Sequence, residues 1–130
     1  MIMYNPLIEI IIVYAIPIIF ILCGVIYINH PPKTIGFSGY KTGMAKQNKD
    51  TWKTAHNIFG KISILIGIIQ LIVAICTVDH FLNQQESAAH AFFLLEMCFQ
   101  LVLLGIGVMI TEARLRMIFD NDGVRKQKKT

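Results

Sequence analysis

Three long apolar stretches constrain this sequence more than any other feature. They cover residues 7–28, 60–78 and 91–110, and a helix needs about 20 such residues to cross the hydrocarbon core of a bilayer. Charged residues make up only 15% of the chain, whereas soluble domains carry about a quarter. The sequence therefore predicts a single membrane domain over 1–130, all-α in fold class, with three transmembrane helices.

The distribution of positive charge predicts how these helices cross the membrane. Every Lys and Arg lies either within residues 29–61, which end at the start of the second stretch, or after the third stretch: Lys33, Lys41, Lys46, Lys49, Lys53 and Lys61, then Arg114, Arg116, Arg125, Lys126, Lys128 and Lys129. Positively charged segments stay in the cytoplasm. We therefore expect the loop 29–59 and the tail 111–130 to be cytoplasmic, with the N-terminus and the loop 79–90 outside. Residues 1–6 contain no Lys or Arg, so we expect the first stretch to be a retained span rather than a signal peptide.

The segment before the second stretch has the pattern of an amphipathic helix. Asn48 or Asp50 can cap a helix that starts near Thr51, because both side chains accept hydrogen bonds from free backbone N–H groups. Trp52 and His56 then share one face of that helix with other apolar residues. This pattern predicts an interfacial helix that leads into the second span. In the alternative interpretation, Trp52 is a headgroup anchor and the lysines only set the topology.

Small and polar residues form a stripe on each of the last two spans. The stripes consist of Gly60, Ser63, Gly67 and Gln70, and of Glu96, Gln100, Gly107 and Thr111. Gln70 and Gln100 each lie ten residues from the inner end of their span, at a height of roughly 15 Å. Because small residues allow close approach and amides bond across helices, we expect an antiparallel hairpin joined through these stripes.

Two carboxylates lie inside the predicted spans. Glu9 lies near the outer end of the first span, where we expect it to reach the headgroups. Glu96 lies deeper, one turn from Gln100, and ionisable residues at such depth usually face the protein interior. Two roles remain open for Glu96. It can join the hairpin as a hydrogen-bonded acid, or it can bind a cationic or amide-rich ligand or carry protons. For the two glutamines we favour a purely structural role.

The order of residues in the long loop resembles a known family. The pattern consists of Gly39-Tyr40-Lys41-Thr42, then Asn48, Asp50-Thr51-Trp52, Ala55-His56 and Gly60-Lys61, and after the last span Thr111-Glu112, Phe119-Asp120 and Asp122-Gly123. It is similar to the SdpI family of bacterial membrane immunity proteins over about residues 31–126. Lys41 stands where the family commonly has Arg. The resemblance makes Tyr40, Lys41, Thr42, Asn48, Thr51, Trp52, His56 and Glu112 candidate functional residues, beside Glu96, Gln100 and Gln70.

The resemblance also implies a function and a set of partners. It implies a protein of the bacterial cell membrane that protects its own cell by binding or sequestering a hydrophobic, membrane-active peptide toxin. In the namesake system, the immunity protein also holds a transcriptional repressor at the membrane, so a cytoplasmic repressor is a candidate partner. Anionic lipids at the inner face are another, given the basic loop and tail. Three helices bury little area, which makes a second copy of the chain a further candidate.

Other function classes find less support. The sequence contains no nucleotide-binding loop, zinc spacing or catalytic dyad, so we expect no enzyme, no cofactor and no metal site. Nothing points to nucleic acid. The alternative function is a small transporter or channel subunit that uses Glu96 as a proton or cation site. Small multidrug exporters have a similar length and one membrane carboxylate, but they have four spans and a weaker charge bias.

Overall fold

A computed structural model describes residues 5–127 as a bundle of three long helices. The helices are α1 (Pro6–Asn29), α2 (Lys49–Leu82) and α3 (Glu86–Ile118). Each is long and apolar enough to cross a membrane. This confirms the predicted all-helical fold with three membrane-spanning candidates.

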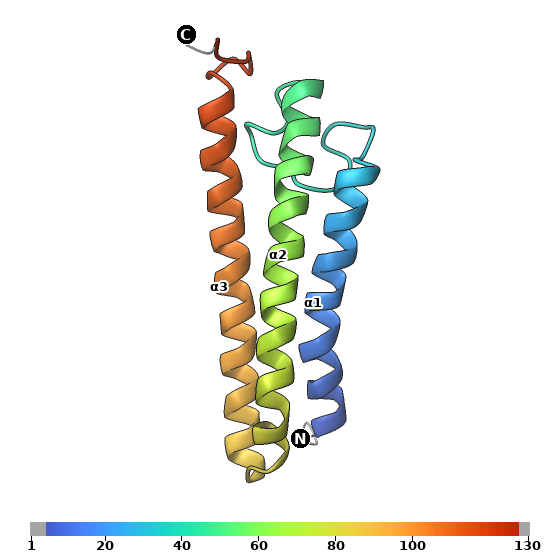
Figure 1. Ribbon diagram of the computed structural model, residues 1–130, viewed down its shortest axis with the longest axis vertical. Helices are drawn as coiled ribbons and strands as arrows, with labels where there is room; N and C mark the ends of the chain where they lie inside the picture. The colour runs from blue at the N-terminus through green and yellow to red at the C-terminus, as the bar shows by residue number, and fades with distance from the viewer. Residues whose placement is uncertain (1–4, 128–130) are drawn as a thin grey trace.

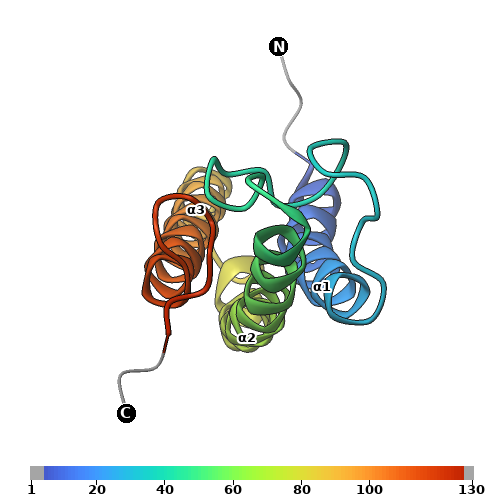
Figure 2. The ribbon, with the colours of Figure 1, turned by 90° about the horizontal axis from the view of Figure 1, so that it is seen from above.

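The helices run side by side and alternate in direction (Figure 1). We call the end that holds the short α2–α3 connection the hairpin end; α1 also begins there. We call the opposite end the capped end, because the loop 30–48 and the segment 119–127 fold over it. The view along the bundle shows α2 between the other two helices, with the loop filling the space between α1 and α3 (Figure 2). The two outer helices accordingly touch each other little.

The glycines of α2 pack against α1, and this corrects the predicted stripe. A Cβ atom on Gly67 would lie 2.8 Å from the carbonyl oxygen of Pro17, and one on Gly60 would lie 2.8 Å from that of Gly24. The α2–α3 contact instead uses Gly107, which packs against the side chains of Ile62 and Ile66. The sequence pattern identified the small residues correctly but assigned two of them to the wrong neighbour.

The second helix is continuous from its first residue to the hairpin end. Asn48 precedes it, and its side-chain oxygen accepts hydrogen bonds from the N–H groups of Asp50 and Thr51, each at 2.9 Å. This confirms the cap at Asn48, with the helix starting two residues before the predicted Thr51. Residues 49–59 do not form a separate helix, so the predicted interfacial element is not confirmed.

Candidate functional site

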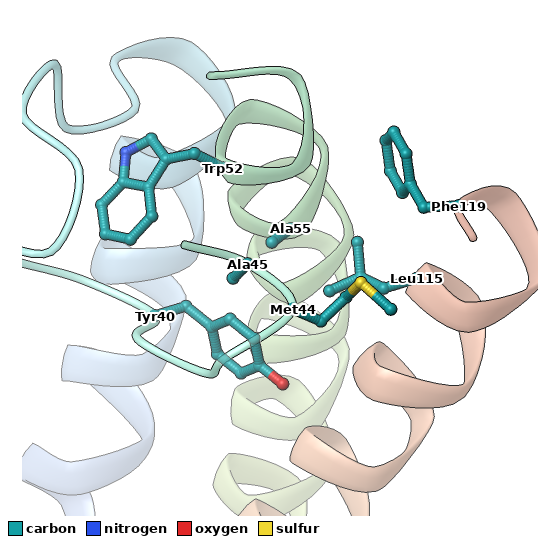
Figure 3. Packing of buried hydrophobic residues seen from close by; sticks show 7 residues of the cluster. All are labelled: Tyr40, Met44, Ala45, Trp52, Ala55, Leu115 and Phe119. Atoms are coloured by element: carbon teal, nitrogen blue, oxygen red, sulfur yellow. The ribbon is translucent and has the colours of Figure 1, made fainter. Parts of the chain in front are cut away.

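The capped end is held together by an apolar cluster drawn from the loop, α2 and α3. Its members are Tyr40, Met44, Ala45, Trp52, Ala55, Leu115 and Phe119 (Figure 3). Trp52 is only 3% exposed, and its indole N–H donates to the carbonyl oxygen of Pro32 at 2.7 Å. Trp52 therefore packs inside the protein, which rules out the headgroup-anchor interpretation.

His56 connects α2 to the loop by two hydrogen bonds. Its Nε2 accepts from the backbone N–H of Tyr40 at 3.0 Å, and its Nδ1 lies 2.8 Å from the carbonyl oxygen of Trp52. Because one nitrogen accepts and the other faces an acceptor, the ring is the neutral tautomer with its hydrogen on Nδ1. Gly39 makes this contact possible, since its φ is +91° and a Cβ there would collide with the imidazole.

Tyr40 also connects the loop to α3. Its hydroxyl donates to the Glu112 carboxyl at 2.9 Å and lies 3.3 Å from the carbonyl oxygen of Val108. Burial, together with the neighbouring Glu112, raises the pKa of Tyr40 well above its ordinary value. The hydroxyl therefore stays protonated and remains a donor at every physiological pH.

Tyr40→Phe tests this connection. We expect it to lower the free energy of unfolding by about 2 kcal/mol, because the lost hydrogen bond has a charged acceptor. Glu112→Gln should lower the free energy of unfolding by less in the Tyr40→Phe variant than in the wild type. Unfolding of the single and double variants in detergent would measure that coupling, and strictly additive losses would argue against the bond.

The segment after α3 is tied to the start of α2. The side-chain amide of Asn48 donates to the carbonyl oxygen of Gly123 at 2.8 Å, and Arg125 forms a two-pronged ion pair with Asp50 at 2.6 and 2.7 Å. Thr51 is fully buried, and its hydroxyl lies 2.9 Å from the carbonyl oxygen of Asn48, to which it donates, and 3.2 Å from that of Ala45. The hydroxyl of Thr42 accepts from the N–H of Ala45. The structure thus brings seven of the predicted site residues to the capped end, while Lys41 in the same loop is exposed; the seven are Tyr40, Thr42, Asn48, Thr51, Trp52, His56 and Glu112.

The two membrane glutamines meet in the middle of the bundle and connect all three helices. The Gln70 amide donates to the backbone oxygen of Gln100 at 3.2 Å, and the Gln100 amide donates to that of Val13 at 3.2 Å. Both side chains are buried. The predicted meeting of the two residues is therefore found, but through the backbone of Gln100 rather than between the two side chains.

A groove of about 230 Å³ opens between the three helices on the hairpin side of these glutamines. Its walls are mainly apolar and aromatic, with Tyr14 from α1, Thr77 from α2, and Phe92, Phe93 and Phe99 from α3. Among the described residues, Glu96 supplies the only carboxyl group that lines it. One carboxylate oxygen of Glu96 is buried without a hydrogen-bond partner. The arrangement suits a ligand that is largely apolar and carries a hydrogen-bond donor.

Glu9, which the sequence analysis expected to reach the headgroups, is buried against a neighbouring helix. It is 8% exposed, and its Oε1 lies 2.7 Å from Nδ1 of His90 on α3. The signal was available in the sequence, since a carboxylate and a histidine both lie near the predicted outer ends of their spans. Within residues 5–127, no group of three or more His, Cys, Asp or Glu is arranged to hold a metal ion.

Comparison with known proteins identifies the family. Searches of curated proteins and of solved structures give no match. A model of the SdpI/YfhL protein family matches residues 33–111, which hold most of the capped end together with all of α3 that lines the groove. The chain belongs to the SdpI/YfhL protein family.

Proposed function

We propose that this chain is a membrane immunity protein that protects a bacterial cell by sequestering a membrane-active peptide toxin. The family supports such a role. The observation that carries the proposal is the groove, an apolar interhelical site with one unpaired carboxylate oxygen. Leu95 is 65% exposed at its wall, and Phe92 and Phe99 are each 36% exposed. The groove is thus accessible from the lipid-facing surface, where a hydrophobic peptide would be dissolved.

The proposed orientation places the capped end in the cytoplasm and the groove in the outer half of the bilayer. The charge pattern supports it, since both basic segments join or fold over the capped end. A toxin that arrives from outside would then meet the groove first. The loop and the segment 119–127 would face the cytoplasm, where a repressor could dock on them. Residues 49–59 would lie at the level of the inner headgroups.

Glu96→Gln tests the site within the cell. We expect the toxin concentration that halves survival to fall by about tenfold, because a single charge-dependent contact of ordinary strength is removed. Glu86→Gln is the matched control, since Glu86 is an exposed carboxylate in the first turn of the same helix. Equal protection by wild type and Glu96→Gln at matched membrane levels would remove Glu96 from the site.

A second function, the transport of protons or cations, is favoured by one specific observation. Glu9 and Glu96 each have a buried oxygen without a partner among the described residues, and each lies in the first half of a helix that begins at the hairpin end. Intramembrane carboxylates of this kind are typical of ion pathways. Proton flux into liposomes that contain the purified protein distinguishes the two functions, because sequestration predicts no flux above that of empty liposomes.

A further inference from the structure

The unsatisfied polar atoms among the described residues are mostly carboxyl and amide oxygens, with one serine hydroxyl that can also donate. Among the described residues, the buried side-chain atoms without a hydrogen-bond partner are Glu9 Oε2, Ser63 Oγ, Gln70 Oε1, Glu96 Oε1 and Gln100 Oε1. Every one is an oxygen. Leaving a buried acceptor unpaired costs about 1–3 kcal/mol, so a ligand that donates hydrogen bonds is favoured here over one that accepts them.

Three of these oxygens belong to residues that lie close together, Gln70, Glu96 and Gln100. Gln70 contacts the backbone of Gln100, and Glu96 lies one helical turn from Gln100. The groove begins directly beside them, because its lining includes Glu96 and also Val13, whose carbonyl oxygen accepts the Gln100 amide. The two glutamines therefore lie next to the groove without lining it, whereas Glu96 is one of its lining residues.

The aromatic residues that line the groove indicate which kind of hydrogen-bond donor it would bind. Tyr14, Phe92, Phe93 and Phe99 line the groove, and aromatic faces attract organic cations. A metal ion would need several oxygen ligands and water, which this mainly apolar lining does not supply. An ammonium group on an apolar stem fits this lining, because the cation can contact the Glu96 carboxyl group while the stem packs against the aromatic rings. The volume suffices, since a cavity of about 150 Å³ already holds benzene.

We propose that the groove binds an organic ammonium group carried on an apolar stem. Given the proposed function, on which this step rests, the natural source is a lysine or amino-terminal ammonium of the peptide toxin. The depth of Glu96 in the predicted span supports a peptide as the source of the ammonium group. Glu96 lies five residues inside the predicted outer end of the third span, at a depth of about 8 Å. Interfacial amphipathic peptides bury their apolar face by about 5–10 Å.

The test uses a matched pair of small probes and the purified full-length protein in nanodiscs of phosphatidylglycerol. The probes are 2-(4-fluorophenyl)ethylammonium and the neutral 2-(4-fluorophenyl)ethanol, followed by fluorine NMR. We expect saturable binding of the ammonium probe, weakened at least about tenfold in Glu96→Gln and unchanged in Glu86→Gln, because the removed charge faces the ligand directly. The alcohol should bind weakly and equally to all three proteins.

A second variant keeps the test decisive if Glu96→Gln is unstable. Phe99→Leu retains an apolar wall but removes an aromatic face, so it should weaken the ammonium probe more than the alcohol. Equal binding of the two probes to wild type would overturn the proposal. Loss of ammonium binding in nanodiscs of phosphatidylethanolamine would reassign the groove to a lipid headgroup and overturn the peptide source.

The proposed function and this inference can fail separately. Protection of cells without binding of the ammonium probe would leave the immunity function in place and overturn the ligand chemistry. Charge-dependent binding of the probe without protection against any toxin would support an ammonium-binding groove and overturn the peptide toxin as its natural ligand.

Discussion

Gly39→Ala is expected to detach the loop from the capped end and to lower the free energy of unfolding by about 3 kcal/mol. Gly39 has a φ of +91°, and a side chain in that region costs about 1–2 kcal/mol. Its Cβ would also meet the imidazole of His56, so the bond from the Tyr40 N–H could not form. The loss of that buried bond supplies the rest of the effect.

The measurement combines unfolding in detergent with limited digestion by trypsin. Cleavage at Lys41 and Lys46 should become faster, because the loop that carries them is no longer held against α2. Gly43→Ala is the control within the same loop. Gly43 has no positive φ, and a Cβ there would meet no atom within 4 Å. A Gly39→Ala protein that unfolds and is cleaved like Gly43→Ala would contradict the role of His56 in holding the loop.

Gly67→Leu is expected to force α1 and α2 apart, at a cost of about 3 kcal/mol, the upper end of the range for overpacked sites. A Cβ at this position would already lie 2.6 Å from Cγ1 of Ile21 and 2.8 Å from the carbonyl oxygen of Pro17. The second contact is with backbone, so a side-chain rotation in α1 cannot relieve it. The whole of α1 must move, and the groove loses the geometry of its α1 wall.

Gly105→Leu is the matched control, because it introduces the same side chain into a helix where a Cβ meets nothing within 4 Å. We expect this variant to be as stable as the wild type or slightly more stable, since leucine forms helices better than glycine. Unfolding of both variants in the same micelles makes the comparison. Equal stabilities would mean that α1 and α2 do not pack through Gly67.

The fold was predictable because it depends on local composition. An apolar stretch of sufficient length can only be a helix in the bilayer, where every backbone group must be paired internally. The cap at Asn48 was predictable for the same reason, since it depends on neighbours two and three residues away. The turn after α3, where Asp120 Oδ1 accepts from the N–H groups of Asp122 and Val124, is also a local structure.

The partners of each residue were harder to predict, because they depend on contacts between distant parts of the chain. Helical spacing placed Gly60 and Gly67 on one face but could not indicate which helix faces them. Trp52 was assigned to the membrane interface, since the pattern does not reveal that the loop covers it. Glu9 was assigned to the headgroups for a similar reason, because its partner His90 lies 81 residues away. The contribution of α1 to the lining of the groove was not predicted.

The arrangement also explains why the motif residues and the groove can serve different purposes. Tyr40, Asn48 and His56 mainly hold the loop and the last segment against the helices. Glu96 lies in the first half of α3, towards the hairpin end. Changes at the capped end should therefore act on stability, whereas changes in the groove should act on ligand binding.

The most direct test of the central claim is the survival of a sensitive bacterium that expresses this chain. The cells are challenged with a panel of membrane-permeabilising peptide toxins, including any encoded beside its gene, and insertion of the protein is verified in the same cells. We predict selective resistance to one toxin or a closely related group, and a reduction of this resistance by about tenfold in Glu96→Gln. Correct insertion with no resistance to any toxin would contradict the immunity function and would make proton flux the next measurement.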